Sequence, residues 1–275
     1  MTKQFALRDL VDDRPADGVF RVNRALFRDR ELFDLEMKHV FEGGWVFIGL
    51  ATQAENPNDF FTSFIGRVPI IVQRDGEGEL RCPVNVCPHK GVRLVQKLCG
   101  NASRHVCPYH GWMFDSAGCY SPAFDEDSHD LAEVARFGEY QGLLFASLNP
   151  DVPSLEEHLG EAAKLLDLVA DKAPNGLELV PGRVTFTYAA NWKMQLENCS
   201  DQYHFTSTHP SYIRILEERA KEQSVEVVQS SIGAADFWTE GAAGVTGGTM
   251  SFDHGHVLNW GIMPVSNAIA DFERA

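Results

Sequence analysis

The sequence lacks any long hydrophobic run. Its longest apolar stretches, at 45–51 and 142–148, are far shorter than the ~20 residues that a membrane-spanning helix needs. The first 18 residues contain no apolar segment of signal-peptide length either. We therefore expect a cytoplasmic protein that does not enter a membrane.

Basic residues are also in short supply, with 24 Lys and Arg against 39 Asp and Glu and a formal net charge of −15. Nucleic acids and anionic lipid surfaces bind clustered positive charge, so neither is an expected partner. A glycine-rich phosphate-binding fingerprint is missing as well. The stretch 241–248 is rich in glycine but lacks the required spacing, and we expect a flexible loop there.

Six cysteines are present, but without a secretion signal a disulfide framework is not expected. Four of them have no histidine at a spacing that suits a shared metal, so we expect small side chains in the packed interior. These four are Cys82, Cys99, Cys119 and Cys199. The remaining two each precede a histidine by two or three residues.

The N-terminal part predicts one helix. Asp29 suits the N-cap, and Gly43 suits the C-terminal end of a helix over 29–43. The side chains expected to face inward are Leu32, Phe33, Val40 and Phe41.

Between residues 45 and 149 the pattern changes to short β-type segments separated by turns, as in a small antiparallel sandwich or barrel. Two hairpins are predicted. One places strands 70–73 and 80–86 around the turn 74–79, and the other places strands 112–114 and 119–121 around the turn 115–118.

A second helix is predicted to begin at Ser154, because Ser154 and Glu157 form a capping box. Its apolar period continues to the breaker at 174–176. The segment 184–190 alternates like a strand, and a further helix is expected from about Trp192.

Two short Cys–His pairs are the strongest chemical signal: Cys87-Pro-His89 and Cys107-Pro-Tyr-His110. Each pair puts a thiolate and an imidazole on one turn, and a glycine after each histidine lets the backbone fold closely around a metal group. The donor set suits a tetrahedral zinc ion or a [2Fe–2S] cluster with mixed ligands. Zinc fingers group Cys with Cys and His with His, so the mixed turns favour the cluster, while zinc stays open.

A second set of candidate ligands follows about 90 residues later. Asp201 and His204 are three residues apart, so we expect them on one face of a helix. His204 and His209 are five apart and would diverge on a regular helix. Pro210 disfavours helical geometry at His209, so the helix is expected to end or deform there and bring the imidazoles together. Two histidines and a carboxylate form the facial triad of non-haem Fe(II) oxygenases.

On these residues the sequence resembles the Rieske non-haem iron aromatic-ring-hydroxylating oxygenases, through their large (α) subunit. Cys87-Pro-His-Lys-Gly91, Cys107-Pro-Tyr-His-Gly-Trp112 and the D-x-x-H-x(4)-H spacing from Asp201 match the family's three elements in the same order. Lys90 stands where arginine is more usual. The benzoate, toluate and anthranilate branch looks most similar, through segments 31–49, 135–151 and 191–204.

The resemblance implies a role for each matched residue. In this family two cysteines hold one iron of the cluster and two histidines hold the other. The implied cluster ligands are Cys87, His89, Cys107 and His110, and the implied mononuclear-iron ligands are His204 and His209. Asp201 matches an aspartate that bridges to a cluster histidine of a neighbouring subunit, and Asn198 matches an asparagine near the iron. Glu197 and Tyr203 complete the motif, with supporting roles expected.

The family's third iron ligand is an aspartate in the C-terminal part of the catalytic domain, and no residue here is assigned to it. Asp253, beside His254 and near His256, forms the nearest Asp/His group, and we expect a turn or strand end there. The family's α subunits are longer than these 275 residues. We therefore expect a truncated chain that binds the cluster but does not hydroxylate by itself.

The implied fold is α+β. A small antiparallel Rieske domain at 44–150 is expected to be inserted in a helix-on-antiparallel-sheet, helix-grip-like catalytic domain at 151–275, incomplete here. An N-terminal helical segment at 1–43 is expected to pack on the catalytic domain.

The implied activity is that of a terminal oxygenase. It takes NADH-derived electrons through the Rieske cluster to a mononuclear Fe(II) and dihydroxylates an aromatic carboxylate of the anthranilate, benzoate or salicylate type with O₂. The implied partners are a flavin/[2Fe–2S] reductase, with or without a separate ferredoxin, a small β subunit, and further copies of the chain in a homotrimer or an α3β3 assembly.

Three alternatives stay open. A monooxygenase or demethylase of the same family would carry the same iron site, because pocket shape selects the outcome. A Rieske electron carrier would need the cluster but not the second set of ligands. A zinc-binding structural protein would use neither set for redox chemistry.

Overall fold

The computed structural model describes residues 7–121, 129–173, 176–180, 184–201, 204–211, 214–215, 218 and 247–261. The chain divides into two compact units, Met1–Thr187 and Tyr188–Ala275. The predicted three-part division at 43 and 150 stays a prediction. No helix in the described part of the chain is long and apolar enough to cross a membrane.

The first unit begins with a small hairpin, in which β1 (Val11–Arg14) and β2 (Val19–Val22) pair antiparallel. The 3-10 turn η2 (Pro15–Asp17) joins the two strands, and η1 (Leu7–Asp9) and η3 (Arg24–Phe27) flank the hairpin. Helix α1 (Arg30–Glu36) follows, and its predicted cap is confirmed: the Asp29 carboxylate accepts the backbone N–H of Glu31 and of Leu32, at 2.9 and 3.1 Å.

The C-terminal end of the first predicted helix differs from expectation. After α1 the chain forms a π-helical turn, η4 (Met37–Phe41), with Glu42 N–H donating to the Met37 carbonyl at 2.8 Å. A π-turn rotates successive side chains by less than an α-turn, so the apolar period shifts. Leu32 is buried as predicted, but Val40 is 48% exposed, and its predicted inward orientation is wrong.

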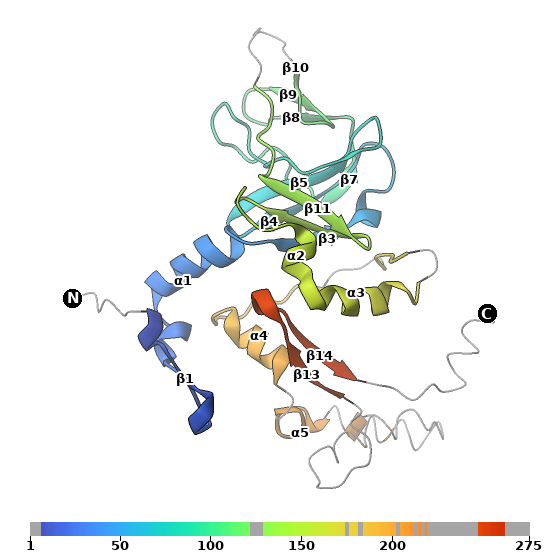
Figure 1. Cartoon of the computed structure of the whole chain (residues 1–275). Coiled ribbons are helices and arrows are strands. Elements are labelled where there is room, and N and C mark those ends of the chain that lie inside the picture. The colour runs from blue at the N-terminus through green and yellow to red at the C-terminus, as the bar shows by residue number, and fades with distance from the viewer. Residues whose placement is uncertain are drawn as a thin grey trace, which may run out of the picture. The chain divides into compact units, whose positions relative to one another are not determined.

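Antiparallel sheets make up most of the rest of this unit (Figure 1). A four-stranded sheet has the order β6 (Leu80–Arg81), β5 (Val68–Arg74), β4 (Asp59–Ile65), β7 (Cys99–Asn101). A three-stranded sheet has the order β11 (Arg136–Tyr140), β12 (Leu143–Ser147), β3 (Val46–Leu50), with η5 (Ala51–Ala54) after β3. A second three-stranded sheet has the order β10 (Tyr120–Ser121), β9 (Met113–Asp115), β8 (Arg104–Val106).

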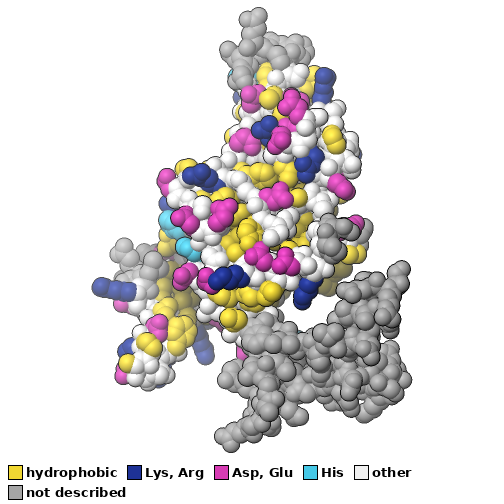
Figure 2. Space-filling view, turned by 45° about the vertical axis from the view of Figure 1, so that its right-hand side comes forward, with side chains coloured by type: hydrophobic (Ala, Val, Ile, Leu, Met, Phe, Trp, Pro, Cys, Tyr) yellow, Lys and Arg dark blue, Asp and Glu magenta, His cyan; other side chains and the backbone are white. Residues whose placement is uncertain are grey.

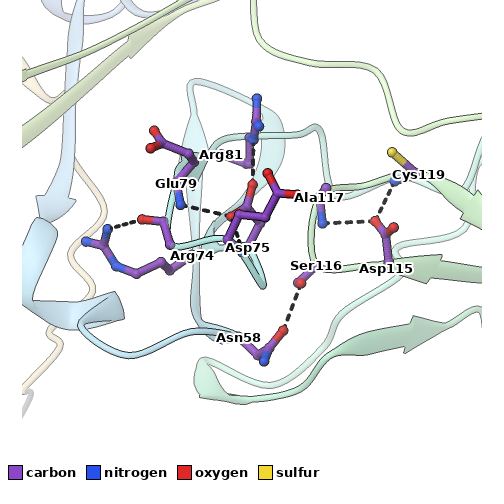
Figure 3. A network of polar contacts seen from close by, with 11 residues as sticks. Asn58, Arg74, Asp75, Glu79, Arg81, Asp115, Ser116, Ala117 and Cys119 are labelled. Atoms are coloured by element: carbon purple, nitrogen blue, oxygen red, sulfur yellow. Dashed lines mark hydrogen bonds and ion pairs between the residues drawn. The ribbon is translucent and has the colours of Figure 1, made fainter.

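Both predicted hairpins are confirmed. Strands β5 and β6 pair Gln73 with Arg81, and strands β9 and β10 pair Phe114 with Tyr120. At the first turn, Asp75 is 3% exposed and accepts the backbone N–H groups of Glu77 and Glu79 and the Arg81 Nε–H, at 2.9 to 3.0 Å (Figure 3). Because these donors satisfy the buried carboxylate, the turn holds the β5–β6 register.

Two hydrophobic clusters fill the first unit. One lies between the four-stranded sheet and the β3–β12 pair, with Ile48, Ile65, Ile70, Val72 and Leu144 among its members. The other includes Phe60, Ile71, Leu94, Val95 and Phe114 together with Cys87 and Cys107. The second cluster therefore reaches the two Cys–His turns, which lie at the end of the unit where Figure 1 shows β8, β9 and β10.

The helical segment after β12 begins as predicted and then breaks. Ser154 and Glu157 form the reciprocal capping box at the start of α2 (Leu155–Leu159). At Gly160, with a φ of 48°, the chain leaves α-geometry, and η6 (Gly160–Ala162) leads into α3 (Ala163–Ala170). The predicted continuous helix is therefore interrupted, because glycine adopts this left-handed conformation without steric cost.

In the second unit, α4 (Lys193–Ser200) and α5 (His204–Thr208) precede a hairpin of β13 (Gly247–Ser251) and β14 (Val257–Gly261). The helix expected from about Trp192 is confirmed. The strand expected at 184–190 is wrong: those residues form no strand, and Val184 and Phe186 are 78% and 85% exposed. Of the expected glycine-rich loop, 241–246 lies outside the described residues, while Gly247 and Gly248 begin β13.

The expectation that four cysteines pack in the interior holds for one of them. Cys82 is 1% exposed, and burial raises the pKa of its thiol. Cys99, Cys119 and Cys199 are exposed. Spacing to histidine excluded all four as ligands but carried no information about which strand face or helix face each occupies.

Candidate metal centres

The two Cys–His turns share one backbone geometry. In each, the cysteine N–H donates to the carbonyl five residues on, at 2.8 Å from Cys87 and 2.7 Å from Cys107. The glycine four residues after the cysteine donates back to the cysteine carbonyl at 3.0 Å in both turns. These glycines, Gly91 and Gly111, have φ values of 71° and 76°, a conformation that disfavours residues with a Cβ. The sequence thus builds two equivalent loops that face one site.

The two thiols lie together in the interior. Cys87 and Cys107 are 2% and 3% exposed and belong to one hydrophobic cluster. Burial raises the pKa of Cys87; the backbone N–H groups of His89 and Lys90 oppose that rise and the adjacent Cys107 thiol adds to it. A metal group that binds here displaces thiol protons, since the thiolate is the ligand form.

The two imidazoles lie together on the outer side of the turns. The ring centroids of His89 and His110 are 4.6 Å apart, and His110 is exposed while His89 is half-buried. Burial lowers the pKa of His89, and the nearby His110 and Lys90 lower it further. The neutral imidazole, which is the form that binds metals, is therefore favoured.

This arrangement fits a [2Fe–2S] cluster with mixed ligands. Thiol neighbours thiol and imidazole neighbours imidazole, as required when two cysteines hold one iron and two histidines hold the other. Over the described ranges, no group of three or more His, Cys, Asp or Glu side chains is arranged to hold a single metal ion. A two-iron cluster does not need such convergence, because its ligands are divided between the irons.

An aromatic stack lies beside the first centre, and the sequence did not predict it. Trp112 stacks on His89 with centroids 4.7 Å apart and an interplanar angle of 10°, and it also lies 4.8 Å from Tyr120 and 5.0 Å from His129. Trp112 follows the second Cys–His pair directly, but His129 lies 17 residues further on. No local signal points to His129, because the contact joins residues that are far apart in the sequence.

The second centre combines a confirmed and a corrected expectation. Helix α5 ends at Thr208, so the predicted end of the helix before His209 is confirmed, and the His204 and His209 ring centroids are 5.2 Å apart. Asp201 does not share a helical face with His204 as predicted. It has extended geometry after α4, with φ −97° and ψ 121°, yet its Oδ2 lies 3.2 Å from His204 Nδ1.

For the remaining candidate residues, the described positions alone do not assign a role. Asn198 and Glu197 lie on α4 and are exposed, and Tyr203 lies outside the described residues. Asp253 and His254 form the 3-10 turn η8 (Asp253–Gly255) between β13 and β14, which matches the turn expected there. The roles of all these residues as ligands or site residues stay predictions.

Comparison with known proteins places both centres in one family. Residues 44–128 match the Rieske [2Fe-2S] domain, and residues 176–259 match the catalytic domain of the ring-hydroxylating alpha subunit, together more than half of the chain. The α subunit of toluate 1,2-dioxygenase from Pseudomonas putida is 40% identical over 91% of this chain and 57% of its own length. The anthranilate 1,2-dioxygenase large subunit from Acinetobacter baylyi is 38% identical over 92% of this chain and 56% of its own length.

The fold agrees with a solved structure of the same kind. Naphthalene 1,2-dioxygenase from Rhodococcus sp., bound to indole, superposes with a TM-score of 0.67 at 32% identity, over 70% of this chain and 46% of that chain. The chain belongs to the family of Rieske ring-hydroxylating oxygenase α subunits. It spans little more than half the length of these curated relatives.

Proposed function

We propose that this chain acts in the large subunit of a terminal dioxygenase that hydroxylates an aromatic carboxylate with O₂. The observation that carries the proposal is the first centre, where two buried thiols and two outward imidazoles lie on equivalent turns. When bound, the [2Fe–2S] cluster supplies one-electron storage and the mononuclear Fe(II) supplies the chemistry of O₂.

The buried and the exposed residues of the first centre have different proposed roles. Cys87 and Cys107 would hold the cluster on its buried side, where the surrounding apolar side chains exclude water. His89 and His110 would hold it on the outer side of the turns. Trp112, stacked on His89, fixes the orientation of that imidazole.

The residues of the second centre would hold the mononuclear iron. Asp201 accepts a hydrogen bond from the Nδ1–H of His204 and so leaves Nε2 of that ring for the metal. His209 comes close to His204 because α5 has ended. By family resemblance Asp201 would also join this centre to a cluster histidine of a neighbouring subunit, and Asn198 would lie near the iron.

The substrate class and partners follow from the relatives. Their names give toluate and anthranilate, both aromatic carboxylates, and this supports a ring that bears a carboxylate for this chain. The proposed electron route runs from NADH through a flavin/[2Fe–2S] reductase, with or without a ferredoxin. The proposed assembly is a trimer of this subunit, alone or with a small β subunit.

Growth of the organism that carries the gene tests the proposal on the protein in its own setting. Deletion of the gene should abolish growth on an aromatic carboxylate, tested on benzoate, toluates, anthranilate and salicylate, and leave growth on benzene or biphenyl unchanged. The wild-type gene should restore growth, and genes encoding Cys107→Ser or His204→Ala should not. Unchanged growth on every aromatic acid, or restoration by both variants, would contradict the proposal.

A further inference from the structure

A pair of polar side chains lies in the interior of the first unit. Figure 2 shows Lys, Arg, Asp and Glu side chains spread over one face of the molecule, whereas Gln73 of β5 and His105 of β8 are 0% and 5% exposed. His105 Nε2 lies 2.7 Å from Gln73 Oε1, and the Phe60 ring meets the imidazole edge to face, with centroids 5.1 Å apart. Neither polar residue belongs to the two candidate centres.

The hydrogen bond runs from the imidazole to the amide. Burial lowers the pKa of His105, which favours the neutral ring with its single N–H. Gln73 Oε1 can only accept, so His105 Nε2 carries that N–H. Gln73 Nε2 is buried without a hydrogen-bond partner among the described residues. Because an unpaired buried donor costs free energy, and apolar replacement of both members of a pair can be nearly neutral, stability alone does not explain this pair.

Backbone hydrogen bonds join the first Cys–His turn to β5. The Ile71 N–H donates to the Pro83 carbonyl at 2.9 Å, and the Asn85 N–H donates to the Pro69 carbonyl at 2.8 Å. Asn85 precedes Cys87 by two residues. These bonds therefore fix the position at which the first turn leaves β5.

The second Cys–His turn is carried by a different sheet. It is the loop of the β8–β9 hairpin, and in the described part of the chain the β10–β9–β8 sheet has no strand pairing with the sheet that contains β5. Side chains join the two sheets instead. His105, two residues before Cys107, donates to Gln73. Ser116, after β9 at the end away from the Cys107 turn, donates from Oγ to Asn58 Oδ1 at 2.8 Å (Figure 3).

We propose that the Gln73–His105 hydrogen bond positions the Cys107 turn relative to the Cys87 turn, so that both thiolates reach one iron of the cluster. The inference rests on the proposed function. Ile71 belongs to the hydrophobic cluster that contains both cysteines, and Gln73, two residues further along β5, lies on the same face of that strand. Both turns are thus held against one strand, the first through its backbone and the second through a side chain. Gln73 and His105 are positioning residues, since they act through Cys107.

Three variants separate positioning from packing. Gln73→Leu/His105→Phe replaces both members by apolar side chains of similar size and removes the unpaired donor, so it should keep the wild-type far-UV circular dichroism spectrum. His105→Gln retains an N–H donor at about the place of the imidazole Nε2 and is the conservative variant. Ser116→Ala removes the other side-chain hydrogen bond between the sheets and is the matched control.

The bound cluster provides the measurement. Each purified protein is mixed anaerobically with an iron chelator, and the decay of the visible absorbance gives the rate of iron release. Electron paramagnetic resonance of the dithionite-reduced protein gives the g-values and line widths. The double variant should release iron at least about tenfold faster than the wild type and give shifted or broadened lines, because Cys107 is no longer held in one place. His105→Gln and Ser116→Ala should match the wild type.

Several outcomes would overturn the inference. Wild-type release and resonance in the double variant would show that the pair does not position the turn. Equal changes in Ser116→Ala would assign the effect to general packing between the sheets. If the double variant does not fold, His105→Met, which lacks the donor, is compared with His105→Gln, and equal release from these two would contradict the proposal.

Failure of the inference is distinguishable from failure of the proposed function. A wild-type protein without the absorbance of a [2Fe–2S] cluster would overturn both. An intact wild-type cluster whose properties are unchanged in every variant would overturn the positioning role alone.

Discussion

The two candidate centres are built in different ways. The first lies on two turns closed by their own backbone hydrogen bonds, over a core in which Cys87 and Cys107 are almost fully buried. The second lies at the ends of two short helices, and between 188 and 261 no residue whose burial the structure describes is buried. A cluster site can be made by local hairpins alone, whereas an iron site of this kind depends on side chains brought together from several elements.

The largest expected effect concerns the cluster. Cys107→Ser should abolish the iron and sulfide content of the first centre, because a buried thiolate ligand has no substitute among its apolar neighbours. Cys99→Ser, at an exposed cysteine of β7, is the matched control and should retain the cluster. Iron and sulfide analysis with visible absorbance measures both. Full cluster content in Cys107→Ser would place the cluster elsewhere.

The next largest effect is the difference in stability loss between a substitution in the first unit and one in the second. Leu144→Ala removes a fully buried side chain from the core of the first unit and should lower the free energy of unfolding by about 2–5 kcal/mol. Leu196→Ala, on α4 of the second unit where the side chain is 40% exposed, should change it by no more than about 0.5 kcal/mol. Urea unfolding followed by far-UV circular dichroism compares them. Equal losses would mean that the second unit has a core of similar quality.

At the second centre, Asp201→Asn should weaken Fe(II) binding by about 10–100-fold, because the hydrogen bond from His204 Nδ1 loses its charged acceptor. The cluster absorbance should not change. Asp253→Asn, in the hairpin turn of the same unit, is the control. Binding isotherms of the anaerobic protein give the affinities. If Asp253→Asn weakens binding and Asp201→Asn does not, the ligand assignment around His204 is wrong.

The smallest expected effect is a change in how the free energy of unfolding depends on pH. Burial alone would raise the pKa of Asp75, but the backbone N–H groups and Arg81 together outweigh it and hold that pKa below its usual range. A depressed pKa stabilises the fold above the unfolded pKa of about 3.9, and this contribution is lost as the pH falls through the folded value. Asp75→Asn should therefore cost about 1 kcal/mol at pH 7 and progressively less below about pH 4.

Urea unfolding at several pH values checks the Asp75 effect. Asp13→Asn, at an exposed position of β1, is the control and should show no such pH dependence. A loss in Asp75→Asn that stays constant down to pH values well below about 3.9 would show that the carboxylate charge at the β5–β6 turn contributes nothing.

Features fixed by neighbouring residues were predicted correctly from the sequence. The Asp29 cap, the Ser154–Glu157 capping box and both hairpins depend on residues a few positions apart, and all are present. The interruption at His209 follows equally locally from Pro210. In each case the signal is a single turn of chain whose backbone groups need particular side chains.

Other features were predicted wrongly or missed. The 184–190 segment alternates like a strand but finds no partner among the described residues. Val40 is exposed because the π-turn η4 shifts the apolar period. Asp201 follows α4 in extended geometry and does not share a helix with His204. His129 lies against Trp112, 17 residues away in the sequence, and no local pattern predicts that contact. The assignments of ligands and domain boundaries remain predictions.

The central claim, that the Cys–His turns hold a [2Fe–2S] cluster with mixed ligands, is tested most directly by absorbance and electron paramagnetic resonance of the purified chain before and after dithionite. We expect a red-brown protein that becomes paramagnetic on reduction, with a lower average g-value than an all-cysteine cluster gives. A colourless protein that contains zinc and stays silent after dithionite would contradict it, and the oxygenase proposal would fall with the cluster.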